Sequence, residues 1–338
     1  MISEDPQDYV EGVLAGDRRV LSKAITLIES SLFAHQEMAG TVIDRLLPYS
    51  GKAVRLGITG VPGVGKSMFI ESLGMMLVNK GHRVAVLAVD PSSKRSGGSV
   101  LADKTRMEKL AVEERAFIRP SPSGGTLGGV ARKTRETMIA CEAAGYDVMI
   151  VETVGVGQSE TTVASMVDFF LVLMIAGAGD ELQGIKKGIL ELADAVAVNK
   201  ADGDNLEKAE IARKQYANAL HFLTPASPTW TPPVLTCSAL EMIGIDVIWQ
   251  TVLNHREKLK NTGELEEKRQ KQALDWMWAL VEEGLKLRFH KNAEVAKLLP
   301  EVSRAVKNGR IAPTVAASRL LFLMDPQLNK DCLRCDDA

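Results

Sequence analysis

The stretch Gly60-Val61-Pro62-Gly63-Val64-Gly65-Lys66-Ser67 decides the fold that we expect for this chain. A glycine, four free positions and then Gly-Lys-Ser form the pattern of a phosphate-binding loop. A strand is predicted directly before it, at 53–59, and Ser67 opens a predicted helix. The glycines let backbone N–H groups surround phosphates, and the helix N-terminus favours negative charge. We therefore expect this loop, with Met68 after it, to bind a nucleotide: Lys66 would contact the β- and γ-phosphates, and the Ser67 hydroxyl would contact Mg²⁺.

Short apolar segments alternate with longer amphipathic segments around this loop. The apolar segments are 53–59, 84–89, 116–118, 147–153, 169–176, 195–199 and 234–237. Several are apolar almost throughout, as strands buried on both faces are. This alternation predicts an α/β fold of the P-loop NTPase class, with a mostly parallel sheet flanked by helices.

Helical patterns lie on both sides of this α/β region. Residues 1–50 show helical periodicity without a strand, which predicts two or so helices. Three more helices are expected near 264–288, 295–306 and 315–323. We therefore predict an N-terminal helical segment at 1–50, a P-loop domain at 51–261 and a C-terminal helical segment at 262–338.

The composition excludes several classes of protein. The 338 residues include 41 Lys or Arg and 43 Asp or Glu, a net charge of −2. A general nucleic-acid or membrane-surface binder needs a basic field instead. No apolar run is long enough to cross a bilayer, and the acidic N-terminal sequence lacks a signal-peptide pattern. Four cysteines do not make a disulfide framework at this length. We predict a cytoplasmic protein with neither a nucleic-acid nor a membrane partner.

The stretch Asn199-Lys200-Ala201-Asp202 directly follows the apolar residues 195–198 of a predicted strand and predicts guanine recognition. A carboxylate at Asp202 can accept hydrogen bonds from N1–H and the exocyclic amine of guanine, a donor pair that adenine lacks. The Lys200 stem can lie along the base, and Asn199 can hold two loops together. Three residues after the next strand are placed to contact the base through main-chain N–H groups: Ser238, Ala239 and Leu240. The expected ligand is therefore GTP or GDP.

Acidic residues at strand ends are candidates for the metal side of the site. Glu152 ends a predicted strand, where a P-loop enzyme holds Mg²⁺ directly or through water. Asp90 and Asp103 lie on either side of a basic, glycine-rich segment at 94–99 and are further Mg²⁺ candidates. A structural role stays open for each: Glu152 paired with an arginine, Asp90 capping its loop, or Asp103 solvated.

The residue that activates the attacking water is less clear from the pattern. Gly155 can donate its N–H to the γ-phosphate, but the next residue is Val156, where Ras-like enzymes place a water-orienting Gln. The nearest glutamine is Gln158. We expect slow hydrolysis unless a partner or another loop completes the site, and the glycine-rich segment 177–188 is the best internal candidate.

Seven segments together resemble the MeaB/ArgK family of GTPases, whose human members are the methylmalonic-aciduria type A proteins. They are 60–67, 90–93, 97–107, 120–129, 152–160, 177–188 and 199–202. The resemblance implies a homodimeric SIMIBI-class GTPase that gates adenosylcobalamin loading and protects an acyl-CoA mutase, with methylmalonyl-CoA mutase as the expected partner.

For individual residues, the same resemblance places Asp90, Asp103 and Glu152 in the Mg²⁺ and switch network. It makes Lys186 a candidate for activating hydrolysis and assigns the dimer contact to the C-terminal helices. Met68 departs from the family, which more often has a small polar residue there.

Two other functions stay open from the residues. One is a kinase acting on a transport protein or a small molecule, although no acceptor site is recognisable. The other is a metal-delivery GTPase, which needs clustered soft or imidazole ligands. The histidines are scattered, and the sole CxxC pair is Cys332 and Cys335, close to the end of the sequence.

Overall fold

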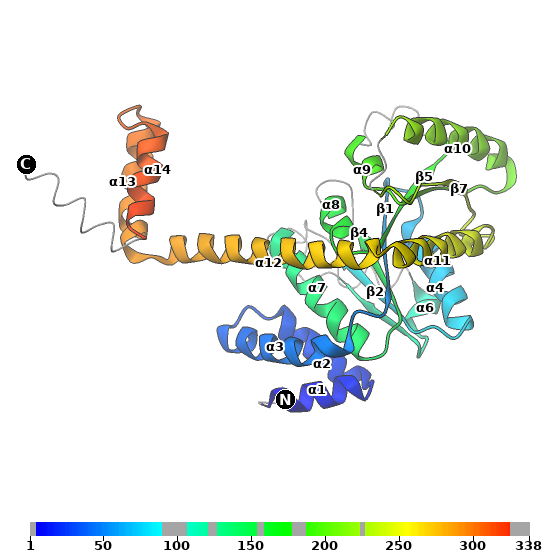
Figure 1. The fold of residues 1–338 in the computed structure, drawn as a ribbon, viewed down its shortest axis with the longest axis horizontal. Helices are drawn as coiled ribbons and strands as arrows, with labels where there is room; N and C mark the ends of the chain where they lie inside the picture. Colours follow the sequence, from blue (N-terminus) through cyan, green and yellow to red (C-terminus); the bar gives the residue numbers. More distant parts are fainter. Residues whose placement is uncertain are drawn as a thin grey trace, which may run out of the picture. The chain divides into compact units, whose positions relative to one another are not determined.

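The computed structural model describes residues 5–89, 107–120, 127–153, 159–177, 187–223 and 227–324. Within these ranges, seven parallel strands form one sheet in the order β3-β2-β4-β1-β5-β6-β7 (Figure 1). The strands are β1 (Val54–Gly60), β2 (Val84–Val89), β3 (Ala116–Arg119), β4 (Val148–Thr153), β5 (Phe169–Ile175), β6 (Ala195–Asn199) and β7 (Val234–Thr236). The predicted α/β class and parallel sheet are confirmed.

The centre of the sheet is closed to solvent. β1 lies between β4 and β5, with Val54 in register with Val148 and Leu56 in register with Phe169. Every residue of β2 and of β4 is buried, as continuous apolar strands require. Because all strands run in one direction, their carboxyl ends meet at one edge, where ligands of such sheets bind.

Helices cover both sides of the sheet. Figure 1 shows α7 and α8 on one side and α4 and α11 on the other, and the members of each pair contact each other. The helices of this region are α4 (Lys66–Asn79), α6 (Glu108–Ala111), α7 (Leu127–Ala143), α8 (Ser159–Ala164), α9 (Lys187–Glu191), α10 (Leu206–His221) and α11 (Ile245–Thr262).

The N-terminal region contains three α-helices within the described residues, where two or so were predicted. They are α1 (Pro6–Leu14), α2 (Arg18–Glu29) and α3 (Phe33–Leu46), and all three contact α7. The break between α1 and α2 comes from Gly16, whose positive φ of 74° ends the first helix, and from Asp17, whose carboxylate caps the second. This turn interrupts the helical periodicity of the apolar residues, which continues across it in the sequence.

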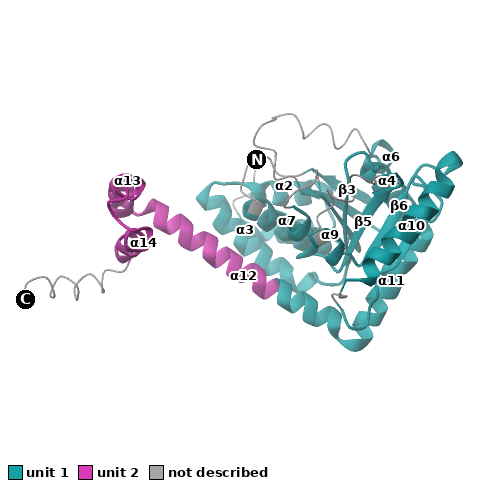
Figure 2. Ribbon diagram, turned by 90° about the horizontal axis from the view of Figure 1, so that it is seen from above, with its two compact units in different colours: residues 1–272 teal, residues 273–338 magenta. Residues whose placement is uncertain are grey.

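The chain divides into two compact units, residues 1–272 and residues 273–338 (Figure 2). The helices after the sheet are α12 (Glu264–Lys291), α13 (Ala293–Lys307) and α14 (Pro313–Phe322), close to the three predicted positions. The predicted domain boundaries, between residues 50 and 51 and between residues 261 and 262, stay predictions. None of the helices in the described ranges is long and apolar enough to cross a membrane.

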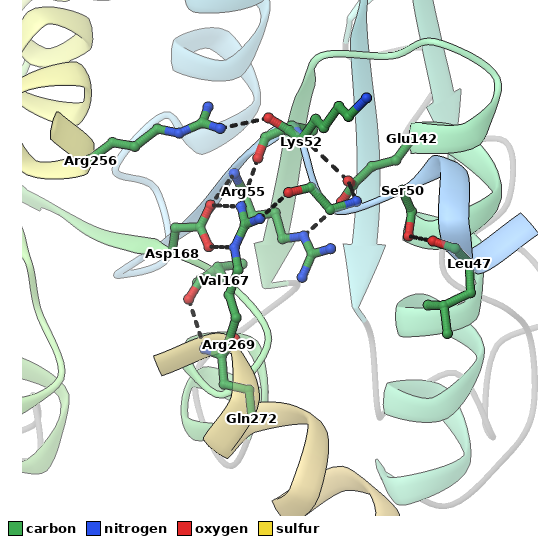
Figure 3. A network of polar contacts seen from close by, with 12 residues as sticks. Leu47, Ser50, Lys52, Arg55, Glu142, Val167, Asp168, Arg256, Arg269 and Gln272 are labelled. Carbon is green, nitrogen blue, oxygen red and sulfur yellow. Dashed lines mark hydrogen bonds and ion pairs between the residues drawn. The ribbon is translucent and has the colours of Figure 1, made fainter. Parts of the chain in front are cut away.

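Buried ion pairs fix the amino ends of β1 and β5 (Figure 3). Asp168, just before β5, accepts two hydrogen bonds from Arg269 at 2.8 and 2.7 Å and one from the Arg55 amide at 3.0 Å. Glu142 of α7 accepts from Arg55 Nε at 2.7 Å and from the Gly51 amide at 2.5 Å. Each carboxylate therefore accepts hydrogen bonds both from an arginine side chain and from a backbone amide at or just before the start of β1.

Candidate nucleotide-binding site

The glycine-rich loop connects the end of β1 to the start of α4 at the carboxyl edge of the sheet. Gly63 and Gly65 adopt left-handed φ angles of 77° and 91°, a conformation that glycine reaches without steric cost. Gly60 has a different constraint: a Cβ there would lie 2.5 Å from the Leu173 carbonyl oxygen of β5. The glycines therefore serve both the turn and the close contact of the loop with the sheet.

Two buried valines anchor this loop while its tip faces solvent. Val61 and Val64 are buried, whereas Pro62 and Gly63 are exposed. Lys66 returns its ammonium to the loop, donating from Nζ to the Gly60 carbonyl at 2.8 Å. Because Lys66 and the half-buried Ser67 are the first two residues of α4, both lie at the positive end of a helix dipole. A phosphate placed there meets backbone N–H groups, an ammonium and a hydroxyl.

Glu152 lies on β4, next to the strand that carries the loop. It is 4% exposed and in register with Ile58 of β1. The following residue, Thr153, shares a buried hydroxyl–hydroxyl hydrogen bond of 2.7 Å with Thr59. Glu152 therefore sits at the same edge of the sheet as the glycine-rich loop.

The donor set at this edge is suited to Mg²⁺. A Ser67 hydroxyl and a Glu152 carboxylate are hard oxygen ligands of the kind that Mg²⁺ prefers, with phosphate and water oxygens completing its shell. The described residues contain no group of three or more His, Cys, Asp or Glu placed to hold a metal by themselves. Asp90 and Asp103, the other predicted ligands, lie outside the described residues.

Asn199, the last residue of β6, joins the glycine-rich loop to the loop after β7. Its Nδ2 donates to the Val64 carbonyl at 2.8 Å, and its Oδ1 accepts from the Ala239 amide at 3.1 Å. The Cys237 thiol also lies 3.6 Å from Oδ1, and burial raises the pKa of this thiol to about 12. Asn199 itself is 1% exposed. One buried amide therefore sets the spacing between a phosphate-binding loop and a predicted base-binding loop.

The segment after Asn199 turns sharply. Lys200 is exposed and has a φ of 60°, a left-handed conformation that costs a residue with a Cβ about 1 kcal/mol. Two hydrogen bonds hold the turn: Asn205 Nδ2 donates to the Lys200 carbonyl at 2.6 Å, and the Ala201 amide donates to the Cys237 carbonyl at 2.9 Å. The strained turn separates a buried Asn199 from a half-buried Asp202.

Asp202 is oriented by Ser238, a fully buried residue just after β7. The Ser238 hydroxyl donates to Asp202 Oδ2 and accepts from the Glu241 amide at 3.1 Å. A carboxylate held at one oxygen keeps the other oxygen and its remaining lone pairs for a ligand.

Two of the three backbone N–H groups that were predicted to contact the base already donate within the protein. The Ala239 amide donates to Asn199, and the Ser238 amide donates to the Ile243 carbonyl at 3.0 Å. Leu240 is 71% exposed, and Met68, on the first turn of α4, is 48% exposed. The contacts of these residues with a nucleotide stay predictions.

Several predicted residues lie outside the described ranges. They are Asp90, Asp103, Gly155, Gln158, Lys186, Cys332 and Cys335, together with most of the segment 177–188. The described part of the site therefore comprises the glycine-rich loop, Glu152, and the segments at Asn199–Asp202 and Ser238–Leu240.

One structural contact of the site escapes motif reasoning. Ser72, on the second turn of α4, donates its hydroxyl to the Ala239 carbonyl at 2.7 Å. Ser72 belongs to no motif, and the contact depends on how closely α4 approaches the loop after β7. The sequence offers no signal for it.

Comparison with known proteins adds a family. Residues 21–294 match the family model described as methylmalonyl-CoA mutase-associated GTPase MeaB. A protein named GTPase ArgK from Escherichia coli (strain K12) is 50% identical, covering 92% of this chain and 94% of its own. The methylmalonic aciduria type A homolog of Mus musculus is 44% identical, covering 95% of this chain and 80% of its own. A crystal structure of a LAO/AO transport system kinase superimposes with a TM-score of 0.78 and 42% identity, covering 96% of this chain and 99% of that one.

Proposed function

The chain belongs to the MeaB family of methylmalonyl-CoA mutase-associated GTPases, and from this premise we propose that it is a GTP-driven chaperone of an adenosylcobalamin-dependent mutase. In this role it binds and hydrolyses GTP, gates the loading of adenosylcobalamin, and protects the mutase from inactivation. The proposed partner is an acyl-CoA mutase, with methylmalonyl-CoA mutase as the first candidate because the family is described by its association with that enzyme.

The observation that carries the nucleotide part is the Asn199 bridge. It joins the loop that ends in Lys66 and Ser67 to the loop that holds Ser238. A guanine nucleotide needs both elements at a fixed spacing, because its phosphates and its base are recognised together. A glycine-rich turn without a nucleotide role has no need of such a buried tie.

The roles of the residues follow from their chemistry. Lys66 binds the β- and γ-phosphates, and Ser67 and Glu152 hold Mg²⁺, which neutralises the charge that develops on the phosphate oxygens. Asp202 accepts the two guanine donors, with Ser238 fixing its orientation. An adenine base would leave this carboxylate without the two donors that guanine supplies, at a cost of about 1–3 kcal/mol.

Hydrolysis is proposed to be slow without the partner. Val156 follows Gly155 where a Ras-like enzyme has a water-orienting Gln. Gln158 and Lys186 are the candidates for that task, and the mutase would stimulate hydrolysis by placing one of them against the γ-phosphate.

We also propose a homodimer formed through α12. Its apolar side chains at Leu274, Met277, Trp278, Val281 and Leu285 recur at helical spacing and are 43–60% exposed. A long helix with one exposed apolar stripe fits a second copy of itself. A Trp278→Glu variant should sediment as a monomer, and Lys271→Glu, on the same helix, should keep the wild-type oligomer. Sedimentation of Trp278→Glu as the wild-type dimer would remove α12 from the interface.

A cytoplasmic location goes with this proposal. Cys141 and Cys237 are buried free thiols, as a reducing compartment permits.

The central test measures GTP binding and hydrolysis with and without a purified methylmalonyl-CoA mutase. Lys66→Ala should lose GTP binding, whereas wild-type hydrolysis should rise when the mutase is added. Tight GTP binding by Lys66→Ala would contradict the phosphate assignment, and an unchanged rate would contradict the partner assignment. Incubation with labelled GTP and cell extract tests the kinase alternative, which predicts labelled phosphoprotein instead of free phosphate.

A further inference from the structure

A pocket of about 400 Å³ opens at the amino edge of the sheet, away from the nucleotide site. Residues that line it include Lys52, Arg256, Lys260, Leu265, Glu266 and Arg269. Lys52 precedes β1 and Gly60 ends it, so a seven-residue strand of about 20 Å separates this basic pocket from the glycine-rich loop. The proposed GTPase activity does not use it.

Two of the arginines near the pocket are already neutralised. Arg269 makes a two-bond contact with Asp168, and Arg55 makes an ion pair of 2.7 Å with Glu142 (Figure 3). These pairs are rigid because both carboxylates are nearly fully buried. Of these residues, Arg269 lines the pocket, and its charge is already balanced by Asp168.

Arg256 and Lys260 supply unbalanced charge to the pocket. They are four residues apart on α11, so they lie on one face of the helix. Arg256 donates to the Lys52 carbonyl at 2.6 Å, and no carboxylate within the described ranges lies within 4 Å of either cation. In Figure 3 the Lys52 side chain points away from Arg256. Arg256 lines the pocket, and its bond to the Lys52 carbonyl uses one of the five N–H donors of the guanidinium.

The charges around Arg256 also favour binding of an anion. The side chain is half-buried, and burial lowers the pKa of its guanidinium. The neighbouring charges of Arg269 and Arg55 act in the same direction, while Asp168 and Glu142 oppose them. A cation desolvated among other cations gains most from an anion that bonds to it directly.

We propose that this basic pocket binds a phosphate monoester of low molecular mass, with Arg256 and Lys260 as its main contacts. Arg256 and Lys260 present two positive charges to a phosphate dianion, and Glu266 is the one carboxylate among the described residues that line the pocket. The guanidinium fork fits two phosphate oxygens. The volume lies in the range of pockets for small ligands, so it has room for the organic part of the ester beside Leu265.

The test titrates inorganic phosphate into the full chain by calorimetry, with GDP and Mg²⁺ at saturation so that the nucleotide site is filled. The pocket variant is Arg256→Gln with Lys260→Gln. The control is Lys208→Gln with Lys271→Gln, an equal change of charge at exposed positions outside the pocket. Wild type and control should bind phosphate alike, and the pocket variant should bind it about tenfold more weakly or worse.

Equal affinity of the pocket variant and the control would overturn the proposal, as would the lack of any binding by wild type. Phosphate held beside GDP in the nucleotide site would be insensitive to the pocket variant, so the comparison separates the two sites. If the double variant is unstable, Lys260→Gln alone replaces it, because that exposed side chain makes no contact on which folding depends. Glycerol phosphate should bind at least as tightly as inorganic phosphate; its exclusion would remove the monoester assignment.

Discussion

Replacing Asn199 with alanine tests the buried tie between the two loops of the site. The change removes the donor to the Val64 carbonyl at 2.8 Å and the acceptor of the Ala239 amide at 3.1 Å. Both partners belong to buried residues, so neither recovers its lost hydrogen bond in bulk water. A buried polar group without a partner costs about 1–3 kcal/mol. Two such groups should lower the free energy of unfolding by about 2–6 kcal/mol.

Equilibrium unfolding in urea measures this loss, and a fluorescent GDP analogue measures the accompanying loss of nucleotide affinity. We expect affinity to fall about tenfold or more, because the spacing between the phosphate loop and the base loop is no longer fixed. Asn205→Ala is the matched control. It removes a single hydrogen bond, to the Lys200 carbonyl, near the surface, and should cost about 1 kcal/mol. Wild-type stability and affinity in Asn199→Ala would refute the reasoning.

Three further predictions concern single groups. Ser238→Ala frees one oxygen of Asp202 and should weaken GDP binding about tenfold by titration, while a variant that binds like wild type would show that the hydroxyl does not orient the carboxylate. Burial raises the pKa of Asp168, but the bonds and charge of Arg269 outweigh it, so the folded-state pKa is lowered. At acidic pH the unfolded chain therefore binds a proton more readily than the folded chain does, so the stability present above about pH 4 should be lost as the pH falls further. Urea midpoints measured across this pH range should fall less for Asp168→Asn than for the wild type. With a pKa of about 12, Cys237 should resist iodoacetamide at pH 8 in the folded protein and react after unfolding, as peptide mass spectrometry can show; labelling of the native chain would contradict its burial.

The sheet could be predicted because its strands are decided locally. β2 is a run of six apolar residues, β6 is four apolar residues that end in Asn199, and both have the predicted bounds. The turn at Gly16 and Asp17 could not be predicted as readily, because helical periodicity continues across it and one left-handed residue breaks the helix. Local pattern therefore determined where elements form, and single backbone angles determined how many there are.

The site was predictable in its motifs and less so in its contacts. The types and spacing of Lys66, Asp202 and Glu152 indicate phosphate, guanine and metal chemistry. The hydroxyls of Ser72 and Ser238 act across segments more than 30 residues apart in the chain, so their partners depend on the folded packing. The role of each residue toward a nucleotide stays a prediction.

The position of β1 in the sheet has a consequence for biosynthesis. Val54 pairs with Val148, 94 residues later in the chain. At a synthesis rate of roughly 5–20 residues per second, β1 and the loop after it wait about 5–20 s before their first neighbouring strand exists. Pairings this distant also make folding slow, because the chain must close a long loop before it gains the contact. The glycine-rich loop is therefore synthesised early but takes its folded position only after β4 has been synthesised. During that interval the nascent chain presents an unpaired, apolar β1.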